Sequence, residues 1–374
     1  MNNNSDHVVI LAGEASGDSL AAHLVTELRT KSPTTTFTGM GGQLMEQAGV
    51  DLIINNKSLD IIGFSEVIKK WRPILRVYRC IKQHILSNRP KLVILVDYPG
   101  FNLRMSKVAK QAGCQVLYYV SPQIWAWRYQ RIKTIKRYVD HMLVLFPFEQ
   151  TLYKNENFPS TFAGHPMVSG IVNALNNPPQ NAPKKNRTIA LLPGSRKKEI
   201  QLLLPPMIKA ANIIHNQYPD IQFIIPLAKK RNPSEINTTL PAYITIVTDN
   251  HYQHISDAVC AICTSGTVTL ETALLGTPHV IIYKTSWLNY KLSKLLLRTK
   301  YIGLSNIVAQ QRLAPELLQH EASPQRIVQS TIPFLNNKKH RDLIQNKYTT
   351  LLQQFKQHDS THTAATIAHQ LLIE

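Results

Sequence analysis

Short, continuous apolar runs alternate with helical patterns from one end of this chain to the other. Residues 92–96 and 188–192, for example, are almost entirely aliphatic, and a segment with the apolar spacing of a helix follows each run. Strands that are apolar on both faces are typical of parallel sheets covered by helices on both sides. The alternation therefore predicts an α/β fold built from doubly wound, Rossmann-like sheets.

The length of 374 residues fits two such domains with a cleft between them. We expect an N-terminal domain over 1–175, a second domain over 186–337 and C-terminal helices over 338–374 that pack back on the first domain. Residues 176–186, rich in Pro, Asn and Lys, are expected to link the domains. The clearest expected strands are 8–12, 92–96, 115–120, 141–146, 188–192, 222–226, 243–247, 258–263 and 279–283.

The chain is strongly basic. Its 42 Lys and Arg residues outnumber its 23 Asp and Glu residues, which gives a net charge of +19. Such an excess indicates an anionic partner, whether nucleic acid, anionic lipid or a phosphorylated substrate. The chain has no zinc finger, no RNP-type aromatic strand and no long basic tail, so we expect no nucleic-acid partner.

Targeting signals and cysteines favour a cytoplasmic location. No apolar run approaches the ~18 residues of a membrane span, and residues 1–7 lack the basic start and apolar core of a signal peptide. Cys260 and Cys263 form a C-x-x-C pair inside an apolar run with no second Cys or His pair nearby. We therefore expect them to be buried strand residues rather than a redox or metal site.

Two glycine turns in the second half predict a binding site for a diphosphate. Residues 192–196 follow an apolar strand and place Arg196 at the start of a helix, and residues 265–267 follow another strand. Backbone N–H groups at a helix start and a planar guanidinium both suit paired phosphate oxygens. The residues expected to bind the pyrophosphate are Ser195, Arg196, Ser265, Gly266 and Thr267.

Glu271 lies one turn into the helix that the second glycine turn opens. It could accept hydrogen bonds from a ribose, or it could be a carboxylate that interacts with the helix dipole. No Asp-x-Asp pair, which metal-dependent nucleotide-sugar chemistry usually needs, occurs in the sequence. We therefore expect no metal and no cofactor, with Arg196 and the helix start stabilising a departing diphosphate.

Three residues of the first half are candidates for a proton-accepting base. Asp97 follows the run 92–96, at the strand end where open parallel sheets bind ligands, although it could instead cap the next helix. Glu14 lies in a glycine turn near the N-terminus, and His165 lies in a Gly-His-Pro turn that it could merely stabilise. The sequence does not decide among the three.

Two further segments combine aromatic or apolar residues with positive charge. The loop 121–128 contains two tryptophans and an arginine, which could stack on a sugar, contact a phosphate or simply pack. Residues 61–82 carry an apolar stripe at helical spacing with a basic flank, and residues 287–298 are similar. A helix of this kind either docks on an anionic membrane surface or packs on the core with solvated lysines.

In this order the motifs resemble those of the lipid-A-disaccharide synthases, a family of glycosyltransferases with the GT-B fold. The resemblance covers about residues 8–335, and the serine-proline-tryptophan run at 121–128 is specific. The matching segments are 12–18, 119–128, 146–149, 164–166, 192–196, 265–267, 270–271, 301–309 and 315–319.

The resemblance implies an inverting, metal-independent transfer. A UDP-2,3-diacylglucosamine donor would give its sugar to the 6-hydroxyl of 2,3-diacylglucosamine 1-phosphate, yielding UDP and a lipid A disaccharide 1-phosphate. By similarity Asp97 is the candidate base, the two glycine turns and Glu271 form the UDP site, and Asn306 is a further active-site candidate. The family also implies a peripheral protein that docks on the cytoplasmic face of the inner membrane of a Gram-negative cell through residues 61–82.

The sequence departs from the family pattern at several positions and leaves alternatives open. Gly100 stands where an Asp is common, Ser305 where a Pro is common, and Gln310-Gln311 where Gly-Arg is usual. The alternatives are another glycosyltransferase or epimerase that uses UDP-GlcNAc, and a non-catalytic paralogue that binds nucleotide sugars or lipids. The oligomeric state and the preferred acyl-chain length are not predicted.

Overall fold

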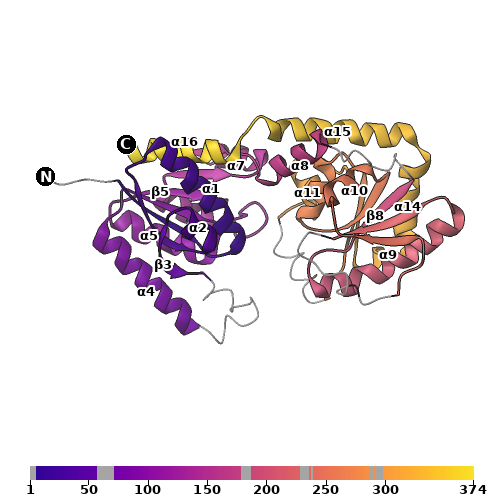
Figure 1. Ribbon diagram of the computed structural model, residues 1–374, viewed down its shortest axis with the longest axis horizontal. Coiled ribbons are helices and arrows are strands. Elements are labelled where there is room, and N and C mark those ends of the chain that lie inside the picture. The colour runs from indigo at the N-terminus through magenta and orange to yellow at the C-terminus, as the bar shows by residue number, and fades with distance from the viewer. Residues whose placement is uncertain are drawn as a thin grey trace. The chain divides into compact units, whose positions relative to one another are not determined.

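The chain folds into two compact units, each built on its own parallel sheet (Figure 1). The computed structural model describes residues 6–56, 71–177, 187–227, 236, 239–286, 290 and 298–374. Unit 1 comprises Met1–Pro166 with Gln357–Glu374, and unit 2 comprises Met167–Lys356. The predicted α/β class, with two doubly wound sheets, is confirmed.

Unit 1 has a seven-stranded sheet of order β3-β2-β1-β4-β5-β6-β7. Its strands are β1 (His7–Ala12), β2 (Thr36–Gly41), β3 (Asp51–Asn55), β4 (Leu92–Val96), β5 (Gln115–Tyr119), β6 (His141–Val144) and β7 (Ser160–Phe162). All neighbours run parallel, and β1 pairs with β4 so that Ala12 lies beside Val96. The order in which the chain adds strands reverses between β1 and β4, which makes this pair the switch point of the sheet.

The helices of unit 1 cover this sheet. They are α1 (Ala15–Lys31), α2 (Gln43–Gln47), α4 (Trp71–Asn88), α5 (Pro99–Gln111), α6 (Arg131–Tyr138), α7 (Pro147–Asn155) and α16 (Ser360–Ile373). β4 is buried along its whole length, which accounts for its purely aliphatic sequence. Alanines of α16 pack in the same apolar core as Leu24 and Leu28 of α1.

Unit 2 has a six-stranded parallel sheet of order β10-β9-β8-β11-β12-β13. Its strands are β8 (Thr188–Leu192), β9 (Gln222–Pro226), β10 (Ile244–Val247), β11 (Cys260–Thr264), β12 (His279–Tyr283) and β13 (Glu316–Leu318). Its helices are α8 (Met167–Asn176), α9 (Lys197–Gln217), α10 (His251–Asp257), α11 (Thr267–Leu274), α13 (Leu304–Ala309), η2 (Gln319–Glu321), α14 (Pro324–Asn336) and α15 (Lys338–Lys356). Here the order reverses between β8 and β11. Cys260 and Cys263 are buried, unpaired residues of β11, as the sequence predicts.

The structure divides the chain at other residues than the sequence suggests. Helix α8 lies within the expected first domain but contacts α10, α11 and α15, so it belongs to unit 2. Of the two C-terminal helices, α15 stays in unit 2 against α11 and α14, and only α16 joins unit 1, against α1 (Figure 1). Both differences come from tertiary contacts that no local sequence signal records. Residues 178–186 of the expected linker lie outside the described residues.

Helix α4 buries part of the stripe that the sequence offered as a membrane face. Val77, Ile81 and Ile85 recur every four residues and are buried in the protein. Ile81 of the segment 61–82, and Ile85 one turn beyond it, therefore pack in the core, which is the packing alternative for these two residues. Other positions of α4 are exposed and include basic residues and two leucines, namely Arg76, Arg79, Lys82, Leu75 and Leu86.

The rest of the proposed membrane surface is not described. Residues 61–70 lie outside the described residues, and so do 287–289 and 291–297. Among the helices that the structure describes, none is long and apolar enough to cross a membrane.

Candidate functional site

A cavity of about 500 Å³ opens in unit 2 at the carboxyl ends of β8, β9 and β11. This position is the switch point of the sheet, where doubly wound folds bind their ligands. The volume suits a nucleotide-sized molecule. Six of the residues predicted from the sequence line this one cavity: Ser195, Arg196, Ser265, Gly266, Thr267 and Glu271.

The first wall of the cavity is the turn between β8 and α9. Gly194 has a φ of +108°, and a Cβ there would lie 2.6 Å from Oε2 of Glu199, so only glycine fits. Glu199 in turn accepts a hydrogen bond from the backbone N–H of Arg196 (3.3 Å) and one from its Nη1 (3.1 Å). The Arg196 side chain is 83% exposed. Because so exposed an ion pair contributes little, the guanidinium can turn toward a ligand at small cost.

The second wall is the turn between β11 and α11. Gly266 has a φ of +151° and precedes the first turn of α11. The hydroxyl of Ser265 donates to the carbonyl of Ile302 (3.0 Å), so this side chain holds the turn in place. The hydroxyl of Thr264, which also lines the cavity, is buried and has no hydrogen-bond partner among the described residues.

Glu271 and two residues of α10 close the side of the cavity. Burial raises the pKa of the Glu271 carboxyl, and burial together with the Glu271 charge raises the pKa of Tyr252 to about 12. Tyr252 and His251 both line the cavity. Sequence reasoning missed these two residues because α10 has only seven residues, too few to show an apolar periodicity.

Asn306, expected at the active site, lies in the core of unit 2. It is fully buried, and its Nδ2 donates to the carbonyl of Ala314 (2.8 Å) and to Oε1 of Glu316 (2.9 Å). Its Oδ1 accepts hydrogen bonds from the N–H groups of Leu313 (2.8 Å) and Ala314 (2.9 Å). These four bonds use the whole capacity of an amide. Asn306 is not among the residues that line the described cavity, and its assignment to the active site stays a prediction.

Asn306 nevertheless connects to the second glycine turn. Glu316, which it contacts, accepts hydrogen bonds from the N–H groups of Ile302 (3.1 Å) and Gly303 (2.9 Å). Ile302 is the residue whose carbonyl holds Ser265. Asn306 is thus linked through Glu316 and Ile302 to Ser265, which lines the cavity.

Asn306→Leu is expected to lower the free energy of unfolding by about 2–4 kcal/mol, because two buried N–H groups lose their acceptor. Chemical denaturation with and without UDP measures this loss. The matched control is Asn336→Ala, which removes an exposed amide bound to the Tyr218 hydroxyl and should change stability by less than about 1 kcal/mol. Unchanged stability with a large loss of UDP affinity would instead support a role for Asn306 in the binding site.

In unit 1, Glu14 and Asp97 lie together at the switch point. Glu14 follows β1 and caps α1, and Asp97 follows β4, the neighbouring strand. The two carboxylates lie close enough that the negative charge of Glu14 helps to raise the pKa of Asp97. The Tyr98 ring occupies the space beside Gly13, where a Cβ would lie 2.5 Å from it, so this glycine turn offers no room for a phosphate.

The backbone of Asp97 is strained and firmly held. Asp97 and Tyr98 both have left-handed φ values, +49° and +46°, which non-glycine residues seldom adopt. The carbonyl of Asp97 accepts hydrogen bonds from Nδ2 of Asn102 (2.8 Å) and from the hydroxyl of Tyr118 (2.7 Å). Strain that is held in this way is typical of functional positions. Asn102 and Tyr118 are supporting residues that sequence reasoning missed.

The electrostatics single out Asp97 as a base. Burial, and secondarily the negative charge of Glu14, raise the pKa of the Asp97 carboxyl to about 6, although the N–H of Tyr98 donates to it. A carboxylate with a pKa near the working pH accepts a proton more readily than an ordinary one. This perturbation at a sheet switch point marks a candidate catalytic group.

His165 lies apart from this pair along the sheet. It follows β7, three strands from β4, and its ring stacks on Phe146 at a centroid distance of 5.4 Å. Burial lowers its pKa to about 4, so the imidazole is neutral and weakly basic at physiological pH. The base assignment therefore rests on Asp97 rather than on His165.

The tryptophan loop after β5 is anchored by a buried carboxylate. Nε1 of Trp125 donates to Oε1 of Glu149 (2.9 Å), whose residue is 2% exposed. The other oxygen of Glu149 accepts hydrogen bonds from the N–H groups of Leu145 and Phe146, each at 3.2 Å. Burial raises the pKa of Glu149 to about 7. Trp125 thus packs and positions the loop, whereas Trp127 lies against two arginines.

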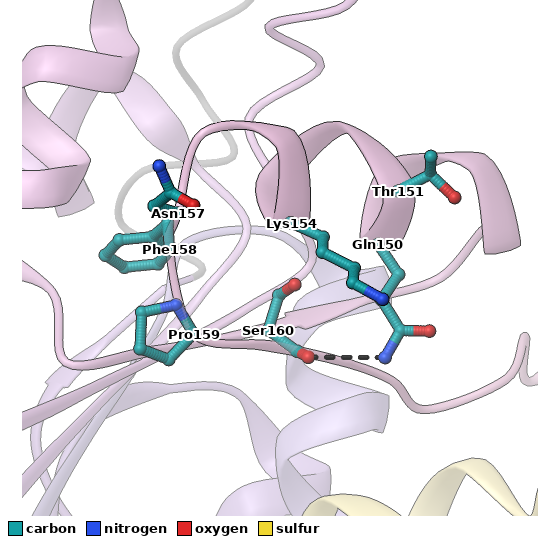
Figure 2. A pocket seen from close by; sticks show the side chains of 7 residues that line it. All are labelled: Gln150, Thr151, Lys154, Asn157, Phe158, Pro159 and Ser160. Carbon is teal, nitrogen blue, oxygen red and sulfur yellow. Dashed lines mark hydrogen bonds between the residues drawn. The ribbon is translucent and has the colours of Figure 1, made fainter.

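A second cavity, of about 620 Å³, lies between α7 and β7 (Figure 2). Its side chains come from one short segment, residues 150–160, and Gln150 reaches across it to donate to the carbonyl of Ser160 at 3.3 Å. Lys154 is its one cationic lining residue. This cavity contains none of the predicted site residues.

Within the described parts of the chain, no group of three or more His, Cys, Asp or Glu side chains is placed to hold a metal ion. Whether the reaction needs a metal stays a prediction.

Known sequences match this chain along nearly its whole length. A family model described as lipid-A-disaccharide synthetase matches residues 8–371. A lipid-A-disaccharide synthase of Coxiella burnetii (strain Dugway 5J108-111) is 43% identical over 369 residues, covering 98% of this chain and 98% of that protein. One of Geobacter sulfurreducens is 42% identical over 342 residues, covering 90% and 89%.

Solved structures of lower identity share the fold. A calicheamicin glycosyltransferase superposes with a TM-score of 0.65 at 13% identity, covering 99% of this chain and 98% of the other. A UDP-GlcNAc 2-epimerase of Neisseria meningitidis, solved with UDP-GlcNAc, gives a TM-score of 0.61 at 12% identity, covering 98% and 99%. At these identities the likeness establishes the GT-B fold alone.

Proposed function

The chain belongs to the lipid-A-disaccharide synthase family and is a glycosyltransferase of lipid A biosynthesis, and we propose that it joins two acylated glucosamine units in a single displacement. The donor is UDP-2,3-diacylglucosamine and the acceptor is 2,3-diacylglucosamine 1-phosphate. The acceptor O6 bonds to C1 of the donor sugar as the bond from C1 to the UDP oxygen breaks. The electron pair leaves with UDP, the O6 proton passes to a base, and attack opposite the leaving group inverts C1.

The observation that carries this proposal is the cavity of unit 2. Two helix-start turns and one exposed guanidinium lie around the same space, which is the arrangement that a diphosphate needs. As the bond to C1 breaks, charge grows on the diphosphate, and Arg196 stabilises that charge. Glu271 lines the same cavity and, in this proposal, accepts hydrogen bonds from the ribose hydroxyls.

Asp97 is the proposed base. Its raised pKa lets it take the O6 proton, and the carbonyl contacts from Asn102 and Tyr118 hold its backbone in place. Asp97 belongs to unit 1, whereas the residues that line the donor cavity belong to unit 2.

The acid limb of the pH–rate profile is expected to follow Asp97. Protonation removes the base, so kcat/KM should fall by half near pH 6 and then about tenfold per pH unit below it. Glu14→Gln removes the charge that raises this pKa, so it should move the limb to lower pH. A flat acid limb, or one that Glu14→Gln leaves in place, would remove Asp97 from the base role.

Two more features belong to the proposal. The reaction needs no metal, because Arg196 and the helix start supply the positive charge that a cation would otherwise give. The protein binds the cytoplasmic face of the inner membrane through residues 61–82, and the exposed basic residues of α4 support this by attraction to anionic lipid.

Mass spectrometry of the product tests the reaction. Donor and acceptor incubated together in detergent should yield a tetraacyl disaccharide 1-phosphate. An acceptor analogue that lacks the 6-hydroxyl should give none, because it has no attacking oxygen. A chain that binds UDP yet forms no disaccharide with the intact acceptor would be a non-catalytic paralogue.

A further inference from the structure

Two arginines surround Trp127 in the loop that leads from β5 to α6. The guanidinium carbon of Arg128 lies 4.5 Å from the centroid of the Trp127 ring, and that of Arg131 lies 5.1 Å from it. Both distances are within the range of a cation–π interaction. One indole thus holds two positive charges close to each other.

In the part of the chain that the structure describes, no ion pair joins a carboxylate to either of these two charges. Ion pairs elsewhere in the described residues join, for example, Lys110 to Asp140 and Arg187 to Asp220, but none there includes Arg128 or Arg131. Burial, together with the charge of Arg128, lowers the pKa of Arg131. Arg128 is exposed and Arg131 is half-buried. The two like charges repel each other, and a bound anion relieves that repulsion.

The loop that carries the arginines is held in shape before any ligand binds. Trp125 is fixed on Glu149, and the N–H groups of Ala126 and Trp127 both donate to the carbonyl of Gln123. Arg128 itself has a left-handed φ of +52°, and its carbonyl accepts a hydrogen bond from the N–H of Arg131 (3.0 Å). A pre-formed loop loses little entropy when it binds a ligand.

The pair of arginines lies near the proposed base. β5 neighbours β4 in the sheet, and the hydroxyl of Tyr118 in β5 donates to the carbonyl of Asp97 (2.7 Å). The negative charge of Asp97 raises the pKa of this hydroxyl, and the positive charge of Arg131 lowers it. The arginines and Asp97 are thus on one edge of unit 1, around the same buried tyrosine.

We propose that Arg128 and Arg131, held by Trp127, bind the phosphate ester on C1 of the acceptor sugar. The inference rests on the proposed function, in which the same acceptor presents its 6-hydroxyl to Asp97. A phosphate monoester carries a charge of about −1.5 to −2 near neutral pH, and guanidinium forks match its oxygens in pairs. The site would select phosphorylated acceptors and set the direction in which the sugar lies.

Comparing two acceptors tests the site. UDP release is measured with 2,3-diacylglucosamine 1-phosphate and with its dephosphorylated analogue, in detergent micelles. The double variant Arg128→Gln/Arg131→Gln should raise the KM for the phosphorylated acceptor by about 10- to 100-fold, with KM for the dephosphorylated one unchanged within about twofold. UDP affinity should not change, and Arg131→Lys should lose part of the preference because it keeps the charge but not the fork.

The matched control is Arg137→Gln on α6. Arg137 also lies over an aromatic ring, that of Tyr138 at 5.4 Å, but it is exposed at the other end of the helix. The Arg137→Gln variant should keep the wild-type preference for the phosphorylated acceptor. If the double variant also keeps that preference, the phosphate site is wrong. If the wild type transfers to neither acceptor, the proposed function has failed instead.

A lipid headgroup would offer the same phosphate chemistry, so binding to vesicles forms a second arm. Vesicles of phosphatidylcholine and phosphatidylglycerol should retain the double variant and the wild type equally. A double variant that loses vesicle binding, and whose KM rises equally for both acceptors, would show a membrane contact and overturn the assignment to the acceptor.

Discussion

Replacing Asp97 with Asn should abolish turnover and leave UDP affinity unchanged. The amide keeps the size of the carboxyl but cannot accept the O6 proton, and loss of a general base typically lowers kcat by about 10²- to 10⁴-fold. The UDP cavity lies in unit 2 and contains no part of Asp97, so binding should persist. Single-turnover rates and calorimetric titration with UDP measure the two effects separately.

The same variant should be more stable than the wild type at neutral pH. The folded state raises the Asp97 pKa from 3.8 to about 6, so ionisation of this group opposes folding. That cost is present above about pH 6 and disappears as the pH falls below the unfolded value. Asp97→Asn removes it and should raise the unfolding free energy by about 1–2 kcal/mol at pH 7.5, after allowance for partial exposure. A variant with near-normal turnover would show that another group is the base.

Replacing Arg196 with Ala should weaken UDP binding by about 10- to 100-fold. Charge-assisted hydrogen bonds to a phosphate contribute about 1.5–3 kcal/mol, and Arg196 is the single arginine or lysine among the residues that line the described cavity. Arg196→Lys should recover only part of the affinity, since a lysine keeps the charge without the paired geometry. Titration calorimetry with UDP provides the measurement.

Lys198→Ala is the control for Arg196. Lys198 is an exposed residue of the same helix start and does not line the cavity, so its loss changes the net charge equally but should alter UDP affinity by less than about twofold. An equal loss of UDP affinity in both variants would mean that Arg196 acts only through the net charge of the protein. Unchanged affinity in Arg196→Ala would remove it from the donor site.

The parts of the fold that local sequence determines were predicted well. The strands β4, β8, β9 and β12 coincide with the predicted ranges. β4, β8 and β12 are buried along almost their whole length, which requires an apolar sequence. The strands β2, β3, β7 and β13 were not predicted. β7 and β13 have three residues each, and β2 contains two glycines, so neither apolar length nor alternation marks them.

The site was predictable where it depends on turns and strand ends. Gly194 and Gly266 need positive φ, and Arg196 and Asp97 follow buried strands, so all four have a local signal. Asn306 was named only from the resemblance, and no local pattern predicts that its amide binds the backbone N–H groups of Leu313 and Ala314. The domain boundaries at α8 and α15, and the core face of α4, depend on which distant elements pack together.

Acceptor-dependent release of UDP tests the central claim most directly. UDP-2,3-diacylglucosamine is incubated with the protein in detergent and EDTA, with and without 2,3-diacylglucosamine 1-phosphate, and free UDP is measured. The account predicts release that requires the acceptor and continues in EDTA. Release that EDTA abolishes would contradict the metal-independent mechanism, and bound UDP with no release in either mixture would contradict the transferase itself.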